Sequence, residues 1–177
     1  MLDTLITSKT RMNIFLKFFL NSKSESYLRH LEDEFKESSN GIRVELNKLE
    51  KAGLLESRLM GNKKLYRANT NHPFFEDIHK LLLKHIGFDQ IIEKVVLKLG
   101  DVDSVFLVGD LAKGIHSEII DLIFVGHINK SFLVTLIEKA EDMIHRNIRY
   151  LVFTQAEMQK YIQEHQKDEY LLLWKVK

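Results

Sequence analysis

The chain has 177 residues, of which 45% are hydrophobic and 29% charged, with a formal net charge of +1 at pH 7 and no cysteine. This composition is that of a folded protein with one medium-sized domain or two small ones. The lack of cysteine excludes disulfides, thiolate metal sites and cysteine nucleophiles. No stretch approaches the roughly 20 apolar residues of a membrane span, and the N-terminus lacks the features of a signal peptide, so we expect a cytoplasmic protein.

Two helices are predicted at the start of the chain. Apolar residues recur at helical spacing over residues 8–20 and again over residues 27–35. Ser24 has the type of side chain that caps the N-terminus of a helix, and we expect it to cap the second one. Lys and Arg outnumber Asp and Glu in residues 1–86, and the reverse holds in residues 87–177. The first half is therefore mildly basic.

A third helix is predicted over Ser38–Lys51. Ile42, Leu46 and Leu49 follow one another at spacings of four and three, which places them on one face. Gly53 is a stop signal shortly after this helix. The polar residues that point elsewhere are Ser39, Asn40, Arg43, Asn47 and Lys48.

A basic hairpin is predicted directly after this helix. Residues 56–60 and 64–68 flank the short connection Gly61-Asn62-Lys63, which suits two antiparallel strands. The hydrogen-bond donors of the hairpin are Arg58, Asn62, Lys63, Lys64 and Arg67.

The order of these elements resembles that of a known protein family. The segment LRHLEDEFKESSNGIRVELNKLEKAGLLESRLMGNKKLYRAN, residues 28–69, resembles the winged helix-turn-helix of ArsR-type bacterial repressors. The resemblance implies that Ser38–Lys51 is the recognition helix and that the hairpin is the wing. Members of that family often sense metals through cysteine ligands, which this chain lacks.

A helical region is predicted over residues 72–100. Pro73 stands near the start of one amphipathic helix, and a second amphipathic stretch follows Gly87. In ArsR-like proteins a helix at the first of these places helps to pair two subunits, so the resemblance implies a homodimer. The alternative is an apolar helix packed between two domains.

Strands and helices alternate in the remaining chain. Residues 103–108, 119–125, 148–153 and 170–176 are short runs rich in β-branched and aromatic residues, whereas residues 131–144 and 155–164 have helical spacing. This order predicts a small α/β domain.

One segment of this domain has a second resemblance. VFLVGDLAKGIHSEIIDLIFVG, residues 105–126, is similar to the strand-turn-strand of nucleotidyltransferases, whose pattern is Gly-Ser, a turn and then Asp-x-Asp. The carboxylates of that pattern hold two divalent ions on a nucleoside triphosphate. The matching residues here are Gly109, Ala112, Gly114, Ser117 and Asp121.

Three departures from this pattern predict that the transfer reaction is lost. Ile119 stands where the first metal-binding Asp is expected, and Asp110 replaces the Ser whose hydroxyl would hold phosphate. The third acid comes from a later strand in the family, and residues 147–154 contain none. A vestigial nucleotide site would comprise Gly109, Asp110, Lys113, Gly114 and Asp121. We expect no catalytic residue, no metal site and no cofactor.

Three further groups of side chains are weighed against ordinary surface residues. His72, Glu76, Asp77, His79 and His85 lie on or near the Pro73 helix but match no defined set of metal ligands. The second group is a possible hydrolytic triad of His116, Ser117 and Asp121. The third is a possible anion pocket of Lys113, Arg146 and Arg149. We favour surface positions for the first group and reject the triad.

The resulting hypothesis is an α+β protein, with an N-terminal winged helix-turn-helix (1–71), linking helices (72–100) and a degenerate nucleotidyltransferase-like α/β domain (101–177). Its predicted function is transcription regulation through double-stranded DNA. Asn40, Arg43 and Asn47 would face base edges, and basic side chains of the hairpin would neutralise phosphates. The C-terminal domain would sense an effector of unspecified chemistry or oligomerise. The alternatives are an active nucleotidyltransferase and a protein-binding winged-helix module.

Overall fold

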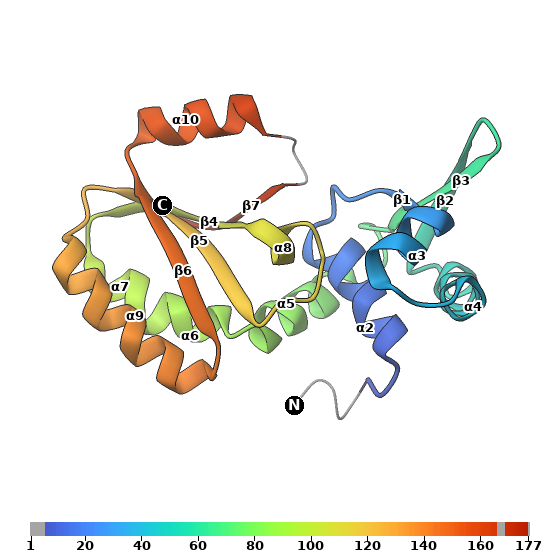
Figure 1. The fold of residues 1–177 in the computed structure, drawn as a ribbon, viewed down its shortest axis with the longest axis horizontal. Coiled ribbons are helices and arrows are strands. Elements are labelled where there is room, and N and C mark those ends of the chain that lie inside the picture. The colour runs from blue at the N-terminus through green and yellow to red at the C-terminus, as the bar shows by residue number, and fades with distance from the viewer. Residues whose placement is uncertain (1–5, 166–168, 177) are drawn as a thin grey trace. The chain divides into compact units, whose positions relative to one another are not determined.

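A computed structural model describes residues 6–165 and 169–176 of the chain. The protein combines helices with two separate β-sheets, which makes it an α+β protein (Figure 1). It divides into two compact units: unit 1 contains residues 1–85 and 114–116, and unit 2 contains residues 86–113 and 117–177. The division falls inside the region 72–100 that the sequence assigned to linking helices. The three-part domain division itself stays a prediction.

Unit 1 begins with a helix whose first residue follows a polar cap. The Ser8 side chain accepts a hydrogen bond from the Arg11 backbone N–H and caps α2 (Lys9–Phe15), which continues into the π-helical segment η1 (Leu16–Leu20). Most of the apolar side chains of η1 are almost completely buried. The predicted helix over residues 8–20 is confirmed, with a change to π-helical bonding in its second half.

The second helix starts later than the sequence indicated. Ser26 and Tyr27 form the short strand β1 (Ser26–Tyr27), which pairs antiparallel with a later strand, and α3 (Leu28–Phe35) begins only after it. The predicted capping role of Ser24 is therefore wrong, because the N-cap is Tyr27 and no side chain bonds there. A strand of two residues is too short to leave a periodic pattern in the sequence.

The third helix and the hairpin follow in the predicted order. α4 (Ser39–Lys51) has Ser38 as its N-cap, with the Ser38 hydroxyl accepting from the Gly41 N–H. β2 (Leu55–Met60) and β3 (Lys63–Ala68) pair antiparallel, and Met60 lies opposite Lys63. The connection is thus Gly61-Asn62 rather than the predicted three residues. Gly61 takes a positive φ of 62°, which a two-residue turn demands and which glycine adopts without steric cost.

The core of unit 1 is built from the apolar faces of these elements. α5 (Phe75–His85) follows the hairpin, and η1 contacts both α5 and β3. Strand order in the small sheet is β1-β3-β2, so the hairpin is held to the rest of the unit along β3. The side chains with 0% exposure include Ile14, Phe18, Phe19, Leu20, Leu31, Ile42 and Leu46.

Unit 2 is organised around a four-stranded mixed sheet of order β6-β5-β4-β7. The strands are β4 (Val102–Val108), β5 (Ile119–Gly126), β6 (Asn147–Phe153) and β7 (Tyr170–Lys175). β4 is antiparallel to β5 and to β7, whereas β5 and β6 are parallel. All four predicted strands are confirmed, as is the alternation of strands and helices.

Helices cover both faces of this sheet (Figure 1). The chain segment of α6 (Phe88–Ile91), π-helical η2 (Ile92–Val96) and α7 (Leu97–Leu99) packs with α9 (Lys130–Ile144), while α10 (Gln155–Glu164) lies on the opposite side. Met158 of α10 packs on Ile123 and Val125 of β5. A short helix, α8 (Gly109–Ala112), follows β4 and was not predicted. Within the described residues no helix is both long and apolar enough to cross a membrane.

A buried ion pair links η1 to α3 in unit 1. The Lys17 ammonium lies 2.9 Å from Glu34 Oε1, and both side chains are only 7% exposed. The apolar pattern of residues 8–20 gave no indication of a lysine on the buried side. Removal of one partner would leave the other charge buried without its counter-ion.

We therefore predict that Lys17→Met lowers the free energy of unfolding of unit 1 by about 3 to 5 kcal/mol. The matched double variant Lys17→Met/Glu34→Leu removes both charges and is expected to recover most of that loss. Urea denaturation followed by circular dichroism measures both. A single variant as stable as the double variant would contradict this assignment.

Candidate functional site

The third helix presents two chemically different faces. Ile42 and Leu46 are 0% exposed, whereas Asn40, Arg43 and Asn47 are exposed. Because side chains three and four positions apart share a face, burial of the apolar stripe forces the polar residues outward. The predicted orientation of this helix is confirmed.

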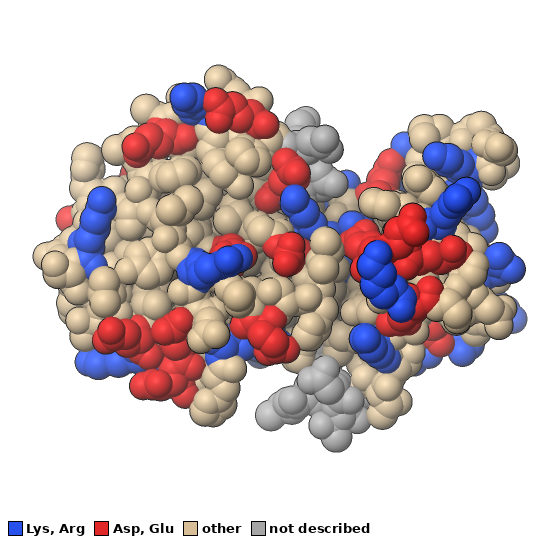
Figure 2. Space-filling model, in the orientation of Figure 1, with Lys and Arg blue, Asp and Glu red and all other residues tan. Residues whose placement is uncertain are grey.

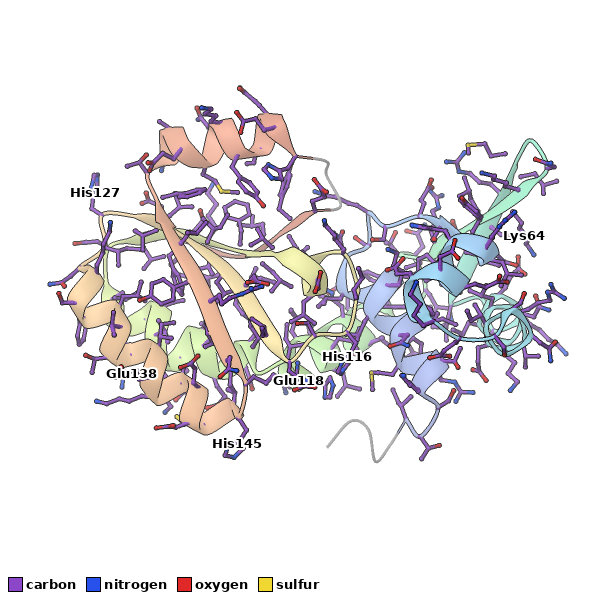
Figure 3. The ribbon with its side chains drawn as sticks, viewed as in Figure 1. Lys64, His116, Glu118, His127, Glu138 and His145 are labelled. Atoms are coloured by element: carbon purple, nitrogen blue, oxygen red, sulfur yellow. The ribbon has the colours of Figure 1, made fainter. Side chains whose placement is uncertain are left out.

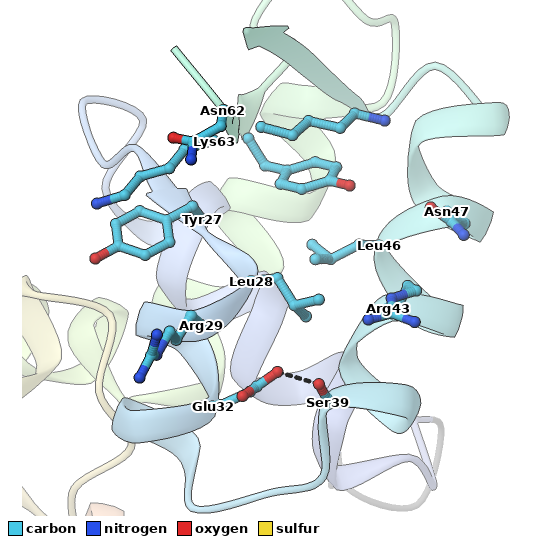
Figure 4. A pocket seen from close by; sticks show the side chains of 12 residues that line it. Tyr27, Leu28, Arg29, Glu32, Ser39, Arg43, Leu46, Asn47, Asn62 and Lys63 are labelled. Carbon is cyan, nitrogen blue, oxygen red and sulfur yellow. Dashed lines mark hydrogen bonds between the residues drawn. The ribbon is translucent and has the colours of Figure 1, made fainter. Parts of the chain in front are cut away.

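A groove of about 600 Å³ lies in unit 1 between α3, α4 and the hairpin (Figure 4). Leu28 of α3 and Leu46 of α4 are at its floor, and the polar side chains of α4 and the hairpin border it. Its lining residues are Tyr27, Leu28, Arg29, Glu32, Ser39, Arg43, Leu46, Asn47, Asn62, Lys63, Lys64 and Tyr66. Residues distant in sequence thus form a single surface.

The structure brings together part of the predicted set of DNA-binding residues. Those that line the groove are Ser39, Arg43, Asn47, Asn62, Lys63 and Lys64. Those outside its lining are Asn40, Lys48, Arg58 and Arg67. The first set comes from both α4 and the hairpin, so the groove joins the two elements that the sequence argument treated separately.

Acidic side chains partner most of the basic residues in this region. Arg58 Nη2 lies 2.6 Å from Glu25, Lys64 Nζ 2.7 Å from Glu50, and Arg67 Nη2 3.1 Å from Glu56. On α4, Lys48 Nζ lies 3.1 Å from Glu45, whose carboxylate also accepts from Arg11. Figure 2 shows acidic side chains gathered over α3 and basic ones along the hairpin. The cations of the hairpin are visible in the sequence, but their acidic partners are identified only by the structure.

Arg43 and Lys63 differ from Lys64, the groove cation that pairs with Glu50. Among residues 6–165 and 169–176, neither has a carboxylate within ion-pair distance. Lys63 Nζ instead lies 4.3 Å from the centre of the Tyr27 ring, a cation–π arrangement. Both side chains are exposed. With Arg29, which is also exposed and has no ion pair within the described residues, they are the groove cations available to an anionic ligand.

Tyr27, Arg29 and Tyr66 are among the groove residues that were not predicted from the sequence to bind DNA. Tyr27 and Tyr66 line the groove, and each ring lies beneath a lysine ammonium. Arg29 is an exposed residue of α3 that also lines it. The sequence offered one indication for Arg29, namely that it follows Leu28 and lies outside the apolar stripe of that helix.

In unit 2 the one acid retained from the nucleotidyltransferase pattern is bound to an arginine. Arg149 Nε donates to Asp121 Oδ1 at 2.6 Å, and Arg149 Nη2 donates to Oδ2 at 2.9 Å. Asp121 on β5 and Arg149 on β6 are partners across the parallel strands. The hydrogen bonds and charge of Asp121 raise the pKa of the Arg149 guanidinium further above its usual value. A fixed cation therefore stands beside Asp121.

Of the other residues of the predicted vestigial site, Gly109 lies against Asp121, whereas Lys113 pairs with Glu169. Lys113 lies 3.3 Å from Glu169, and Arg146 donates to the Ser117 carbonyl oxygen. Gly114 is grouped with unit 1. Lys113, Arg146 and Arg149, which were weighed as an anion pocket, thus each have a different partner.

The other side-chain groups weighed from the sequence have simple structural partners. The Ser117 hydroxyl accepts from the Ile119 N–H, and His79 Nδ1 lies 2.8 Å from the Phe19 carbonyl oxygen. Glu118, labelled in Figure 3, precedes β5. Within the described part of the chain, no group of three or more His, Asp or Glu residues is arranged to hold a metal ion.

A second cavity of about 300 Å³ lies in unit 2 between α10 and strands β4 and β7. Its apolar lining includes Phe106, Met158 and Leu172, and Gln159 and Lys175 add polar groups. None of the site residues predicted from the sequence lines it.

Comparisons with known proteins find few similarities. No protein-family model matches the chain, and no curated protein matches it. Among solved structures, one described as "a putative nucleotidyltransferase from Sulfolobus solfataricus" is 24% identical, over 54% of this chain and 82% of that chain, with a TM-score of 0.35.

The backbone conformation and the close surroundings of Gly109, which directly follows β4, both favour glycine at this position. It has a positive φ of 70°, and a Cβ atom there would lie 2.4 Å from Asp121 Oδ2. Because Arg149 holds both carboxylate oxygens of Asp121, that carboxylate cannot easily move aside. Gly109→Ala would add both a conformational penalty and a steric one.

We predict that Gly109→Ala lowers the free energy of unfolding of unit 2 by about 2 kcal/mol or more. An Asp121→Ala background removes the contacts with Oδ2 and Cγ and keeps only the one with Cβ at 3.1 Å, so the same substitution is expected to cost closer to 1 kcal/mol, about the conformational penalty alone. Urea denaturation followed by fluorescence of Trp174, a β7 residue, measures both costs. Equal costs in the two backgrounds would contradict a clash with Asp121.

Proposed function

We propose that unit 1 is a winged helix-turn-helix of the ArsR type and that the protein is a transcriptional regulator that binds double-stranded DNA. α4 would enter the major groove, and the hairpin would act as the wing on the sugar-phosphate backbone. The observation that carries this proposal is the groove itself, in which Arg43 and Asn47 of α4 lie with Asn62, Lys63 and Lys64 of the hairpin. An α-helix with its side chains is about 10–12 Å across, close to the width of the major groove.

The groove residues divide into two proposed roles. Arg43 and Asn47 carry planar groups that suit guanine and adenine edges, respectively, and they leave an exposed helix face. Lys63 has a flexible stem and no acidic partner in the described chain, which suits a phosphate contact. Asn40, Lys48, Arg58 and Arg67 lie outside the groove and would contact DNA only at the margins of the interface.

We also propose that the regulator is a homodimer in which α5 contributes to the pairing. Phe74, just before α5, is 62% exposed, and Leu81 within it is 43% exposed. Two-fold pairing of recognition helices matches a palindromic DNA site.

Unit 2 is proposed to have a sensing or oligomerisation role without catalysis. Arg149 occupies both oxygens of Asp121, and a cation beside this carboxylate opposes the binding of a divalent ion. The cavity beneath α10 is the place that we propose for an effector of small, largely apolar chemistry.

One feature of the hairpin favours a second candidate function. Leu59 is 78% exposed and Met60 is 52% exposed, both at the tip of the hairpin. Exposed apolar side chains are frequent at protein-binding surfaces. A protein-binding winged-helix module with a solvated basic hairpin is therefore the alternative. It predicts no salt-sensitive binding of any duplex.

The decisive experiment is selection of bound duplexes from a random library, with affinities measured over a series of salt concentrations. We predict an enriched palindromic sequence. Arg43→Ala is expected to weaken the preferred duplex by about 1–3 kcal/mol and to relax the choice of base at one position.

Lys63→Ala serves as the matched variant for the backbone contact. It is expected to weaken all duplexes alike and to reduce the slope of log K against log[salt] by about 0.9. If Arg43→Ala and Lys63→Ala altered binding in the same way, the proposed roles of α4 and the hairpin would be wrong.

An enzymatic role for unit 2 has its own test. If the domain transfers nucleotides, magnesium-dependent consumption of a nucleoside triphosphate would be abolished by Asp121→Asn. We predict no consumption that depends on Asp121, measured by release of pyrophosphate.

A further inference from the structure

The Lys64 side chain lines the groove and also forms an ion pair with a residue of α4. Lys64 lines the groove and is labelled on the hairpin in Figure 3, yet its Nζ lies 2.7 Å from Glu50 Oε2. Glu50 belongs to the last turns of α4. The Ser57 hydroxyl of β2 donates to the other carboxylate oxygen, Oε1. Both oxygens of Glu50 are therefore directed at the hairpin.

These contacts keep both partners charged. The hydrogen bonds from Lys64 and then from Ser57 hold the pKa of the Glu50 carboxyl below its usual value. The bond to Glu50 raises the pKa of the Lys64 ammonium above its usual value. A carboxylate therefore binds Lys64 across the neutral pH range, in the same manner as a DNA phosphate would.

We propose that Glu50 competes with the DNA phosphates for Lys64 and thereby limits the affinity of this surface for the backbone, whatever the base sequence. The inference rests on the proposed function of unit 1. It assigns a role in binding to an acidic residue of the recognition helix that does not itself line the groove.

The position of this pair distinguishes it from the other ion pairs of the hairpin. Arg58 and Arg67 also have acidic partners, Glu25 and Glu56, but neither arginine lines the groove. Lys63 lines the groove and has no acid partner within the described residues. Within the described residues, Lys64 is thus the one cation of the hairpin that both lines the groove and pairs with an acidic side chain.

Exchange of the partner is energetically accessible. The side chains of Lys64 and Glu50 are 41% and 30% exposed, so water and salt screen their attraction. Glu50 also stands near the C-terminus of α4, where loss of a negative charge is favourable for the helix dipole. Glu50→Gln is therefore expected to fold.

The test compares Glu50→Gln with the unaltered protein on two duplexes, one selected from the library and one of unrelated sequence. Release of Lys64 to one additional phosphate makes the slope of log K against log[KCl] more negative by about 0.9 and tightens binding about eightfold at 0.1 M KCl. The same fold-change is expected on both duplexes because phosphate contacts carry no sequence information.

Two control variants isolate the Lys64 contact. In a Lys64→Ala background, Glu50→Gln is expected to have no effect on binding. Glu56→Gln releases Arg67, which lies outside the groove at the margin of the proposed interface, and is expected to tighten binding less than Glu50→Gln does. A readout without DNA is the pKa of Lys64 measured by NMR, which should fall in Glu50→Gln.

The outcomes separate the inference from the function on which it rests. If the unaltered protein binds duplexes and Glu50→Gln binds them no more tightly, the inference is overturned and the proposed function stands. An effect of Glu50→Gln that persists without Lys64 overturns it as well. If neither protein binds any duplex at the lowest salt, the proposed function fails and the inference fails with it.

Discussion

The surface of unit 1 depends on a single constraint, the 3.6-residue period of α4. Ile42 and Leu46 are completely buried, and this burial fixes the rotation of the helix about its axis. Rotation then determines that Arg43 and Asn47 point into the groove. A helix rotated by one residue would bury these side chains without partners, at a high cost in desolvation.

The hairpin contributes the opposite border of the groove through a separate constraint. β1 and β3 pair along Ser26–Tyr27, which ties the hairpin to the start of α3 and brings Tyr27 beneath Lys63. The same folding places Glu25 and Glu50 beside hairpin cations. The electrostatic character of the surface is thus a balance of nearby charges, and the number of Lys and Arg residues in the hairpin does not describe it.

Unit 2 shows how a residue in one strand limits the chemistry available to a residue in the neighbouring strand. Asp121 alone has the chemistry of a metal ligand. Arg149 lies opposite it on the neighbouring parallel strand and takes both of its oxygens. Gly109 permits the close approach of β4 to this pair. The three residues form a structural contact.

Most helices and strands of the protein could be predicted from the sequence, because apolar spacing and turn residues are local signals. The outward direction of Arg43 and Asn47, the hairpin after α4 and the alternation of strands and helices in unit 2 were all determined in this way. Only the tertiary structure decided which charges meet: the pairs Lys64–Glu50, Lys17–Glu34 and Arg149–Asp121 join residues 14, 17 and 28 positions apart. Such contacts depend on strand register and helix packing, which leave no periodic pattern in a single chain.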